Sequence, residues 1–326
     1  MALSVVEIGA SKKDGGSRSH SVRFGGATAM PFHLDEGFKS VEPVVAHDVF
    51  DMAIPLPTSV RECFGEALKD PVEWAKKNVE DYKAEAITLH MISTDPKQKD
   101  TSVKDACATV ESFLKEVKAP LIIAGSGNPE KDSKLLVEAA ETASGERCLL
   151  SSVDLKMDYQ SVAKAALEHG HSILSLASMN PEEMRRINLN LIREGLTDDK
   201  IVMDLFTGGV GYGIEYTVSA MEQARLKGLG GVEGLGSPIA SATSNAWSCR
   251  EAWMRRDEWG PREYRGPLWE ETTALVTLLA GADLFMMLHP QAIADFKNYL
   301  DKFYTKEKDE SRKQNPDKDS RKASPD

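Results

Sequence analysis

The sequence lacks the closely spaced cysteine pairs that hold a structural zinc ion or an iron–sulfur cluster. Its four cysteines, Cys63, Cys107, Cys148 and Cys249, are at least 41 residues apart, whereas such sites use neighbouring thiols. Scattered thiols in a chain of this size are typical of reduced, mostly buried cysteines. Any cluster on which the protein depends is therefore expected on another chain.

Long apolar runs and concentrated positive charge are also missing. No stretch of about 18 or more apolar residues occurs, so no membrane-spanning helix is predicted. The N-terminal MALSVVEIGASKKDGG lacks the basic-then-apolar order of a signal peptide, which predicts a cytoplasmic protein. A net charge of −11 argues against a broad nucleic-acid surface, because phosphate binding requires clustered Lys and Arg.

Several site motifs are absent as well. The glycine cluster in MDLFTGGVGYGIEY (residues 203–216) fits neither the P-loop nor the G-x-G-x-x-G fingerprint, because Ile214 stands where the last glycine would fall. No H-E-x-x-H supports a metal hydrolase. No D-x-H-x-x-G occurs either, the motif with which many cobalamin domains donate a histidine to cobalt. No metal ligands are assigned to this chain.

The sequence does contain eight short apolar runs that alternate with helix-like segments. The predicted strands are residues 44–50, 86–92, 121–127, 148–154, 172–177, 201–206, 237–242 and 284–289. Helices are predicted after Ser102, a good N-cap, and at Pro181 and Pro290, where proline suits the first helical position. Eight strand–helix repeats over residues 44–305 predict an α/β TIM (β/α)₈ barrel rather than an open doubly wound sheet.

The two ends of the chain differ from this repeat. Residues 1–43 hold two alternating segments separated by Asp14-Gly15, a turn signal, and are interpreted as a β-hairpin extension over one end of the barrel, with its return strand near residues 21–24. Residues 306–326 have almost no apolar content and mix both charges. They are predicted to form a disordered charged C-terminal tail.

Small and polar residues gather where the predicted strands end. In a barrel of this type, the C-terminal ends of the strands carry the working face, and hydrogen-bonding loops there suit a large neutral or phosphate-bearing ligand. No catalytic residue is assigned. The predicted ligand-binding residues are Asp204, Thr207, Gly208, Gly209, Gly211, Tyr212, Gly213, Ser241, Thr243, Asn245 and His289.

Each of these positions also has a purely structural interpretation. Asp204 at the end of a strand can cap the following loop, and His289 before a proline can tie the barrel rim to backbone. The glycines can simply allow a turn, although the helix that follows could also present its amides to an anion. Tyr212 suits either a planar ligand or a cover for the barrel. His90, within residues 86–92, is interpreted as an interior histidine.

Specific segments resemble a known family. GASKKDGGSRSHSVRFGG (residues 9–26), IVMDLFTGGVGYGIEYTVSAMEQARL (201–226) and GPLWEETTALVTLLAGADLFMMLHPQA (266–292) are similar to the small subunit of the corrinoid iron–sulfur protein. This subunit is also called the delta subunit of acetyl-CoA decarbonylase/synthase. The resemblance spans about residues 5–300.

The resemblance implies a TIM barrel paired with a larger subunit in a heterodimer, with a corrinoid (cobalamin) at the interface and the [4Fe–4S] cluster on the large subunit. The heterodimer would take a methyl group from methyltetrahydrofolate through a methyltransferase. It would then deliver the methyl group to acetyl-CoA synthase in the reductive acetyl-CoA pathway of anaerobes. This chain alone is not expected to hold a complete active site.

Two alternatives remain. A stand-alone pterin-dependent barrel methyltransferase would need an Asp and Asn constellation at the strand ends, for which Asp154, Asn180 and Asp204 are the candidates. A purely structural assembly subunit would contact no ligand.

Overall fold

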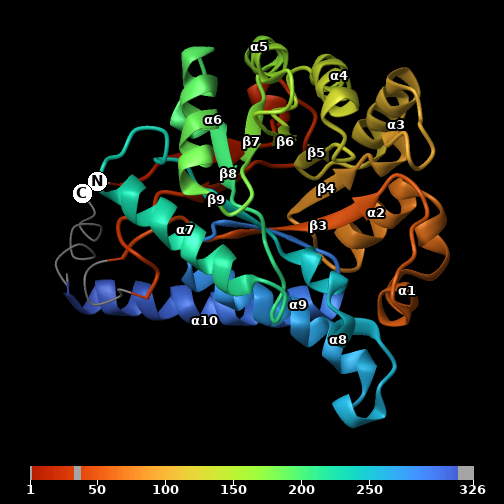
Figure 1. Cartoon of the computed structure of the whole chain (residues 1–326), viewed down its shortest axis with the longest axis vertical. Helices are drawn as coiled ribbons and strands as arrows, with labels where there is room; N and C mark the ends of the chain where they lie inside the picture. Colours follow the sequence, from red (N-terminus) through yellow and green to blue (C-terminus); the bar gives the residue numbers. More distant parts are fainter. Residues whose placement is uncertain (1, 33–37, 315–326) are drawn as a thin grey trace, which may run out of the picture.

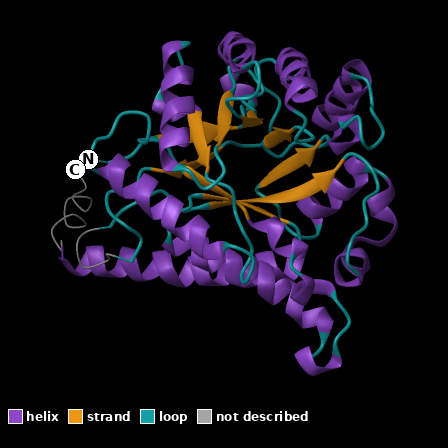
Figure 2. Ribbon diagram, viewed as in Figure 1, coloured by secondary structure: helices purple, strands orange, loops and turns teal. Residues whose placement is uncertain are grey.

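The computed structural model describes residues 2–32 and 38–314 and confirms the predicted (β/α)₈ barrel (Figures 1 and 2). Eight parallel strands close in the order β10-β3-β4-β5-β6-β7-β8-β9. Their bounds are β3 Val44–Phe50, β4 Ala86–His90, β5 Leu121–Ala124, β6 Leu149–Val153, β7 Ser172–Leu176, β8 Ile201–Asp204, β9 Ile239–Ala242 and β10 Leu284–Met287.

Helices surround the barrel in the order that the sequence predicts. They are α1 Thr58–Phe64, α2 Pro71–Glu80, α3 Val103–Glu116, α4 Pro129–Thr142, α5 Tyr159–His169, α6 Pro181–Arg193, α7 Ile214–Leu229, α8 Arg250–Trp253, α9 Arg262–Leu279 and α10 Pro290–Gln314. Ser102 caps α3 by accepting the Asp105 N–H, and proline opens both α6 and α10. None of the helices in the described ranges is long and apolar enough to cross a membrane.

The predicted hairpin is confirmed as β1 (Val5–Ile8) and β2 (Val22–Gly25), which pair antiparallel. Its inward residues Val6, Ile8, Val22 and Phe24 are buried in one cluster with residues from all eight barrel strands, Val44 and Leu284 among them. Because these barrel residues lie at the start of their strands, the hairpin closes the N-terminal end of the barrel. The apolar residues on the outer faces of the strands pack against the helices in a separate core.

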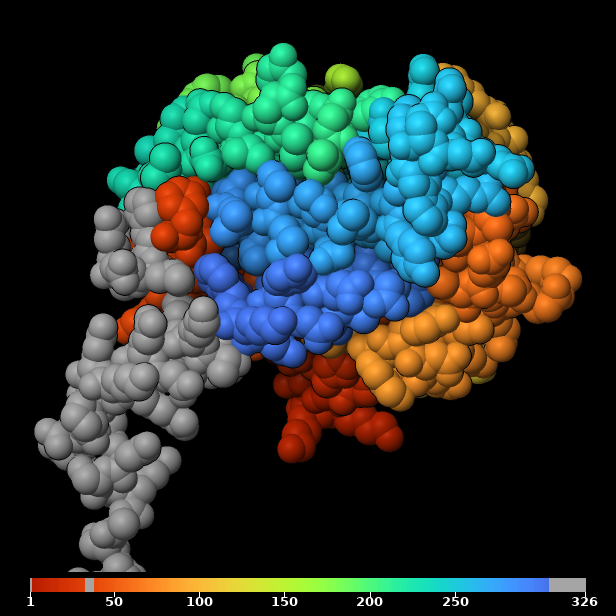
Figure 3. Space-filling view, turned by 90° about the horizontal axis from the view of Figure 1, so that it is seen from below, coloured from red at the N-terminus to blue at the C-terminus, as the bar shows by residue number. Residues whose placement is uncertain are grey.

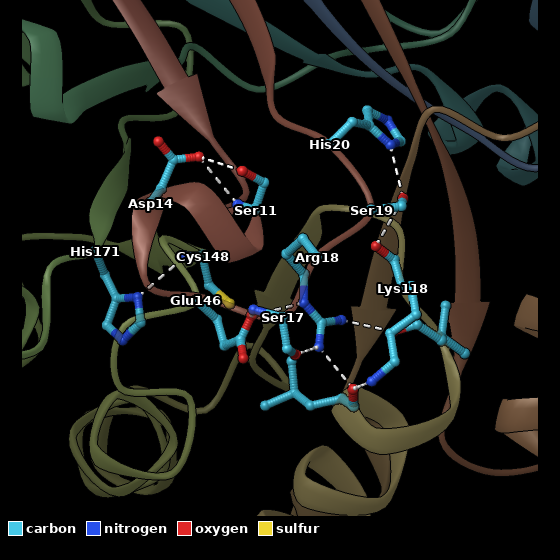
Figure 4. Close-up of polar contacts among 12 residues, drawn as sticks. Ser11, Asp14, Ser17, Arg18, Ser19, His20, Lys118, Glu146, Cys148 and His171 are labelled. Carbon is cyan, nitrogen blue, oxygen red and sulfur yellow. Dashed lines mark hydrogen bonds and ion pairs between the residues drawn. The ribbon is translucent and has the colours of Figure 1, made fainter.

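A buried arginine fastens the hairpin to the barrel (Figure 4). The Arg18 guanidinium donates to the carbonyl oxygens of Val117 and Leu114 at the end of α3, at 2.5 and 2.6 Å, and to Glu146 Oε2 at 2.8 Å. The planar fork of arginine suits this arrangement, since its five donors can reach several acceptors at once. The Ser17 N–H also donates to Glu146, so the loop between β1 and β2 is held at two successive residues.

The C-terminal helix extends beyond the predicted end of the barrel domain. α10 reaches Gln314, so residues 306–314 of the predicted tail are helical. The rest of that tail, residues 315–326, lies outside the described residues.

Candidate functional site

The C-terminal mouth of the barrel is defined here by the inward-facing residues at the ends of its strands. Side chains alternate along a strand, and Ala46, Ala86, Val202 and Ala240 face the barrel interior. The next inward positions toward the strand ends are therefore also in the mouth. They include Asp48, His90, Leu176, Asp204 and Ala242. Of these, His90, Leu176 and Ala242 are half-buried and the two aspartates are buried.

Asp204 lies beneath the rim and holds the loop that follows β8. Its Oδ1 accepts the Phe206 N–H at 2.7 Å, which is the capping role considered from the sequence. Burial raises the pKa of the Asp204 carboxyl to about 7, while the Phe206 N–H lowers it. The carboxyl therefore changes its protonation state near neutral pH.

The loop after β8 presents aromatic side chains to solvent. Phe206 has φ 63°, a left-handed conformation that is strained for a bulky residue and persists where the surroundings enforce it. The Asp204 carboxyl supplies one of those constraints. Phe206 and Tyr212 are 42% and 44% exposed, and Tyr216 at the start of α7 is also exposed.

The glycines of this loop are required by packing inside the protein and by backbone conformation. A Cβ at Gly208 would lie 2.8 Å from the Tyr212 carbonyl oxygen, and one at Gly209 would lie 2.5 Å from Cys249 Sγ. Gly211 and Gly213 have φ values of 77° and 93°, and Gly213 is the N-cap of α7. The Cβ directions of Gly208 and Gly209 are thus filled by the protein itself, and a ligand contact through their backbone stays a prediction.

Three predicted ligand contacts form a buried hydroxyl cluster instead. Thr207 Oγ1 lies 3.1 Å from Ser241 Oγ, which lies 2.9 Å from Thr243 Oγ1 and accepts from Thr277 of α9. All four residues are fully buried. Ser241 follows the inward Ala240 and so points away from the barrel axis. Thr207, Ser241 and Thr243 therefore join the barrel wall to α9 and do not line the mouth.

Asn245 lies close to the same loop but also has a structural partner. It belongs to the 3-10 helix Thr243–Ser248, and its Nδ2 donates to the Thr207 carbonyl oxygen at 3.0 Å. The side chain is half-buried. Asn245 thus couples the loops after β8 and β9 at the rim.

His289 lies against α9, where its backbone N–H donates to Glu270 Oε2, and its role as a ligand contact stays a prediction. It is 5% exposed, stacks on Trp247 with ring centroids 5.7 Å apart, and accepts the Gln291 N–H at Nδ1. Burial lowers the pKa of His289 to about 4. Cys63 Sγ lies 3.6 Å from His289 Nε2, but burial raises the pKa of the thiol, so this pair does not form an activated nucleophile.

The mouth contains a histidine that the sequence interpretation assigned to the interior. His90 Nε2 lies 3.1 Å from Asp48 Oδ1, and the Ser244 hydroxyl donates to Asp48 Oδ2 at 2.5 Å. The His90 ring is stacked on Phe50 with centroids 4.7 Å apart. Asp48 is completely buried, whereas the His90 side chain is 23% exposed. Strand alternation could have indicated that both side chains face inward at the same end.

The Asp and Asn residues considered for a pterin site are engaged by their own loops. Asn180 Oδ1 accepts from the Glu182 and Glu183 amides at the start of α6. Asp154 Oδ1 accepts the Lys156 N–H. Together with the Asp204 cap, these contacts account for all three candidates without a ligand.

Within residues 2–32 and 38–314, no group of three or more His, Cys, Asp or Glu side chains is arranged to hold a metal ion. A pocket of about 650 Å³ lies beside the barrel rim, between residues 55–62 and the helices α8 and α9, with Trp247 and Trp253 in its wall.

Comparison with known proteins identifies the family. Residues 6–256 match the family described as the CO dehydrogenase/acetyl-CoA synthase delta subunit. The chain belongs to this family. It is 46% identical over 299 residues to acetyl-CoA decarbonylase/synthase complex subunit delta 1 of Methanosarcina thermophila, covering 90% of this chain and 68% of that relative. It is 48% identical over 290 residues to the delta subunit of Methanopyrus kandleri, covering 88% of this chain and 72% of the relative.

Similar solved structures are more distant. A dihydropteroate synthase from Yersinia pestis in a sulfonamide drug complex has a TM-score of 0.55 at 11% identity, covering 82% of this chain and 97% of that one. A dihydropteroate synthase from Coxiella burnetii in complex with pteroic acid has a TM-score of 0.54 at 11% identity, covering 84% and 97%. At this level of identity the delta-family chain shares with them the barrel fold alone.

Proposed function

We propose that this delta-family chain is the non-catalytic small subunit of a corrinoid methyl carrier. In this proposal it forms a heterodimer with a large subunit that bears the [4Fe–4S] cluster, and its barrel mouth covers the corrinoid held between them. The carrier takes a methyl group from methyltetrahydrofolate through a methyltransferase and delivers it to acetyl-CoA synthase in the reductive acetyl-CoA pathway.

The observation that carries this proposal is the strained, exposed aromatic rim after β8. Phe206 is held at φ 63° and remains exposed beside Tyr212, although nothing in the barrel core requires an aromatic side chain there. Flat apolar faces suit the surface of a macrocycle, and the neutral polar groups nearby suit its amide substituents. The residues present therefore fit a corrinoid, with Phe206 and Tyr212 as the side chains that would contact it.

The remaining groups of the mouth suit binding and water exclusion better than chemistry. A bound corrinoid would supply the cobalt that accepts and releases the methyl group. Asp204 holds Phe206 in place, and the described part of the mouth offers no thiolate or metal-ligand cluster. An enzyme that activated the methyl donor itself would need a positioned acid or base in contact with it.

The large subunit is proposed to pack on the outer face of α9, called here the α9 face. Its exposed and half-buried residues between 268 and 279 include no charged side chain: they are Leu268, Trp269, Thr272, Leu275, Val276 and Leu279. Leu268 and Leu279 are 53% and 46% exposed. Figure 3 shows α9 between α7 and α10 on one side of the molecule. A contiguous apolar patch of this kind is typical of a protein interface.

Co-expression with the candidate large subunit in the presence of a corrinoid tests the proposal. A single heterodimer peak on size exclusion should carry corrinoid absorbance. The chain expressed alone should elute without it, because a corrinoid bound weakly by one subunit dissociates on the column. Leu268→Glu with Leu279→Glu should abolish the heterodimer peak, whereas Leu167→Glu, an exposed leucine on α5, should not. A chain that remains alone, binds methyltetrahydrofolate and methylates free cobalamin would refute the proposal.

That last outcome would favour the second candidate, a stand-alone pterin-dependent methyltransferase. The fold is shared with dihydropteroate synthases, and the buried Asp204 carboxyl lies at a strand end. Against this candidate, Asp154, Asn180 and Asp204 are each engaged by neighbouring backbone amides.

A further inference from the structure

The His90–Asp48–Ser244 chain at the mouth has an arrangement that a structural histidine does not require. An interior histidine usually satisfies both ring nitrogens, as His171 does by accepting the Cys148 N–H and bonding the Ala140 carbonyl oxygen. His90 Nε2 and Asp48 Oδ1, by contrast, lie at ion-pair distance without forming a straight hydrogen bond. The other ring nitrogen, Nδ1, has no hydrogen-bond partner among the described residues.

The contacts determine how the ring is protonated and held. A bare Nε2 lone pair 3.1 Å from a carboxylate oxygen would be repelled, so Nε2 carries a hydrogen. In the neutral ring Nδ1 then presents its lone pair. The Ser244 hydroxyl fixes the other carboxylate oxygen at 2.5 Å, and Phe50 supports the ring from one side. Asp48 and Ser244 are thus positioning residues for His90.

The location of the ring points to a ligand rather than to the fold. His90 is the last inward residue of β4 and is partly open to the mouth, whereas its partner Asp48 is completely buried. A poorly aligned polar contact of this kind is common at binding and catalytic groups without their ligand, and such contacts tighten when the ligand binds. Leu176 and Ala242, two other half-buried inward residues, are apolar, so His90 is the polar one of these three half-buried positions, above the buried Asp48 and Asp204 carboxyls.

We propose that His90, positioned by Asp48 and Ser244, is the hydrogen-bonding group with which the mouth binds a neutral amide-bearing ligand. Its Nδ1 accepts a hydrogen bond from an amide or lactam N–H. The inward residues assigned to the mouth include the Asp48 and Asp204 carboxyls and no Lys or Arg, which disfavours a polyanion. The inference rests on the proposed function, because both the carboxamides of a corrin rim and the lactam of a pterin present this chemistry.

The test uses the full chain with ¹⁵N-labelled histidine and records the imidazole nitrogen signals by NMR. Before any ligand is added, His90 should show a protonated Nε2 and an unprotonated Nδ1, and Asp48→Asn should weaken that tautomer preference. Two probes are then titrated separately. Dicyanocobinamide carries corrin carboxamides without a nucleotide base, and cyanide on both faces of its cobalt prevents direct ligation by the imidazole; tetrahydrofolate carries a pterin lactam.

A saturable shift of His90 Nδ1 supports the inference, and the probe that causes it identifies the source of the amide. His90→Ala should raise the dissociation constant of that probe about fivefold to tenfold, as for loss of one buried hydrogen bond. Ser244→Ala should have a smaller effect in the same direction. His169→Ala, at the end of α5, is the matched control and should leave the dissociation constant unchanged.

Unchanged His90 signals with both probes would overturn the inference, as would equal affinities for wild type and His90→Ala. That failure is distinct from failure of the proposed function, which is read from the heterodimer and its corrinoid absorbance. A heterodimer that retains corrinoid while its His90 signals remain those of the isolated chain would refute only the role of His90.

Discussion

The two ends of the barrel are built in opposite ways. At the N-terminal end, the hairpin inserts Val6, Ile8, Val22 and Phe24 into a fully apolar cluster. At the C-terminal end, the inward positions include Asp48, His90 and Asp204, and the rim carries exposed aromatic residues. The end closed by the hairpin stabilises the fold through apolar burial. The open end retains buried polar groups that cost stability, which agrees with the proposal that they serve a ligand or partner.

The largest expected effect is at the closed end. Phe24 is completely buried among barrel residues, so Phe24→Ala should lower the free energy of unfolding by about 3–5 kcal/mol through lost burial and a cavity. Urea denaturation of the two proteins measures this. A loss below about 1 kcal/mol would show that the hairpin is a peripheral addition and would remove the contrast between the ends.

The next largest effect on stability is expected at Arg18, whose contacts hold the hairpin to the barrel (Figure 4). Arg18→Ala removes a buried guanidinium together with its hydrogen bonds to the Val117 and Leu114 carbonyl oxygens and its ion pair with Glu146. The Ser17 N–H and Lys118 Nζ still donate to Glu146 and Leu114, so the expected cost in unfolding free energy is about 3 kcal/mol, the low end for a broken buried ion pair. Arg18→Lys keeps the charge but not the planar fork, so an intermediate loss is expected. Equal unfolding free energies for wild type, Arg18→Ala and Arg18→Lys would contradict the role of Arg18 in holding the hairpin to the barrel.

At the open, C-terminal end of the barrel, the predicted effect is on how the unfolding free energy depends on pH. Burial raises the folded-state pKa of Asp204 to about 7, above its value in the unfolded chain. The folded protein therefore binds this proton more tightly. The stabilisation is fully present below the unfolded pKa and is lost as pH rises through about 7, by at most about 1.4 kcal/mol per pH unit.

Asp204→Asn isolates this contribution, because the amide oxygen can still accept the Phe206 N–H. Between about pH 4.5 and pH 7, the variant should lose less stability than wild type in urea titrations. Comparison with wild type is essential, since Glu270 titrates in the same sense and His289 in the opposite one. Parallel curves for the two proteins would show that Asp204 does not titrate in this range.

The smallest effect on stability is expected for a change at neither end. Leu268→Glu with Leu279→Glu alters exposed positions on the α9 face, so unfolding free energy should change by only about 0.5 kcal/mol. In contrast to this apolar face, α3 and α4 carry the exposed ion pairs Lys115–Glu111 and Lys134–Glu130. A large stability loss would mean that α9 is packed within this chain and is not a docking face.

The fold could be predicted almost completely because each strand and helix leaves a local signal. The apolar run at residues 237–242 is only moderately β-prone, yet it forms β9. Backbone pairing with β8 on one side and β10 on the other stabilises the strand there. The helical residues 306–314 could not be predicted, since their composition favours disorder. There, continuation of an existing helix outweighs local propensity.

The contacts of the candidate site could be predicted from the sequence only in part. Strand-end composition does not show which side of a strand a residue occupies. It predicts ligand contacts at Ser241 and His289, but the structure adds that Ser241 bonds Thr277 and that His289 stacks on Trp247. His90 was assigned to the interior because its partners, Asp48 and Ser244, are 42 and 154 residues away in the chain. Such pairing arises only when the barrel closes.

The most direct measurement is hydrogen–deuterium exchange on the reconstituted heterodimer with corrinoid, compared with the chain alone. Amides in residues 205–213 and in the outer part of α9 should be protected in the complex, and those of α3 to α6 should be unchanged. Protection confined to α3–α6 or to the hairpin end, with the loop after β8 exchanging as in the isolated chain, would contradict the account.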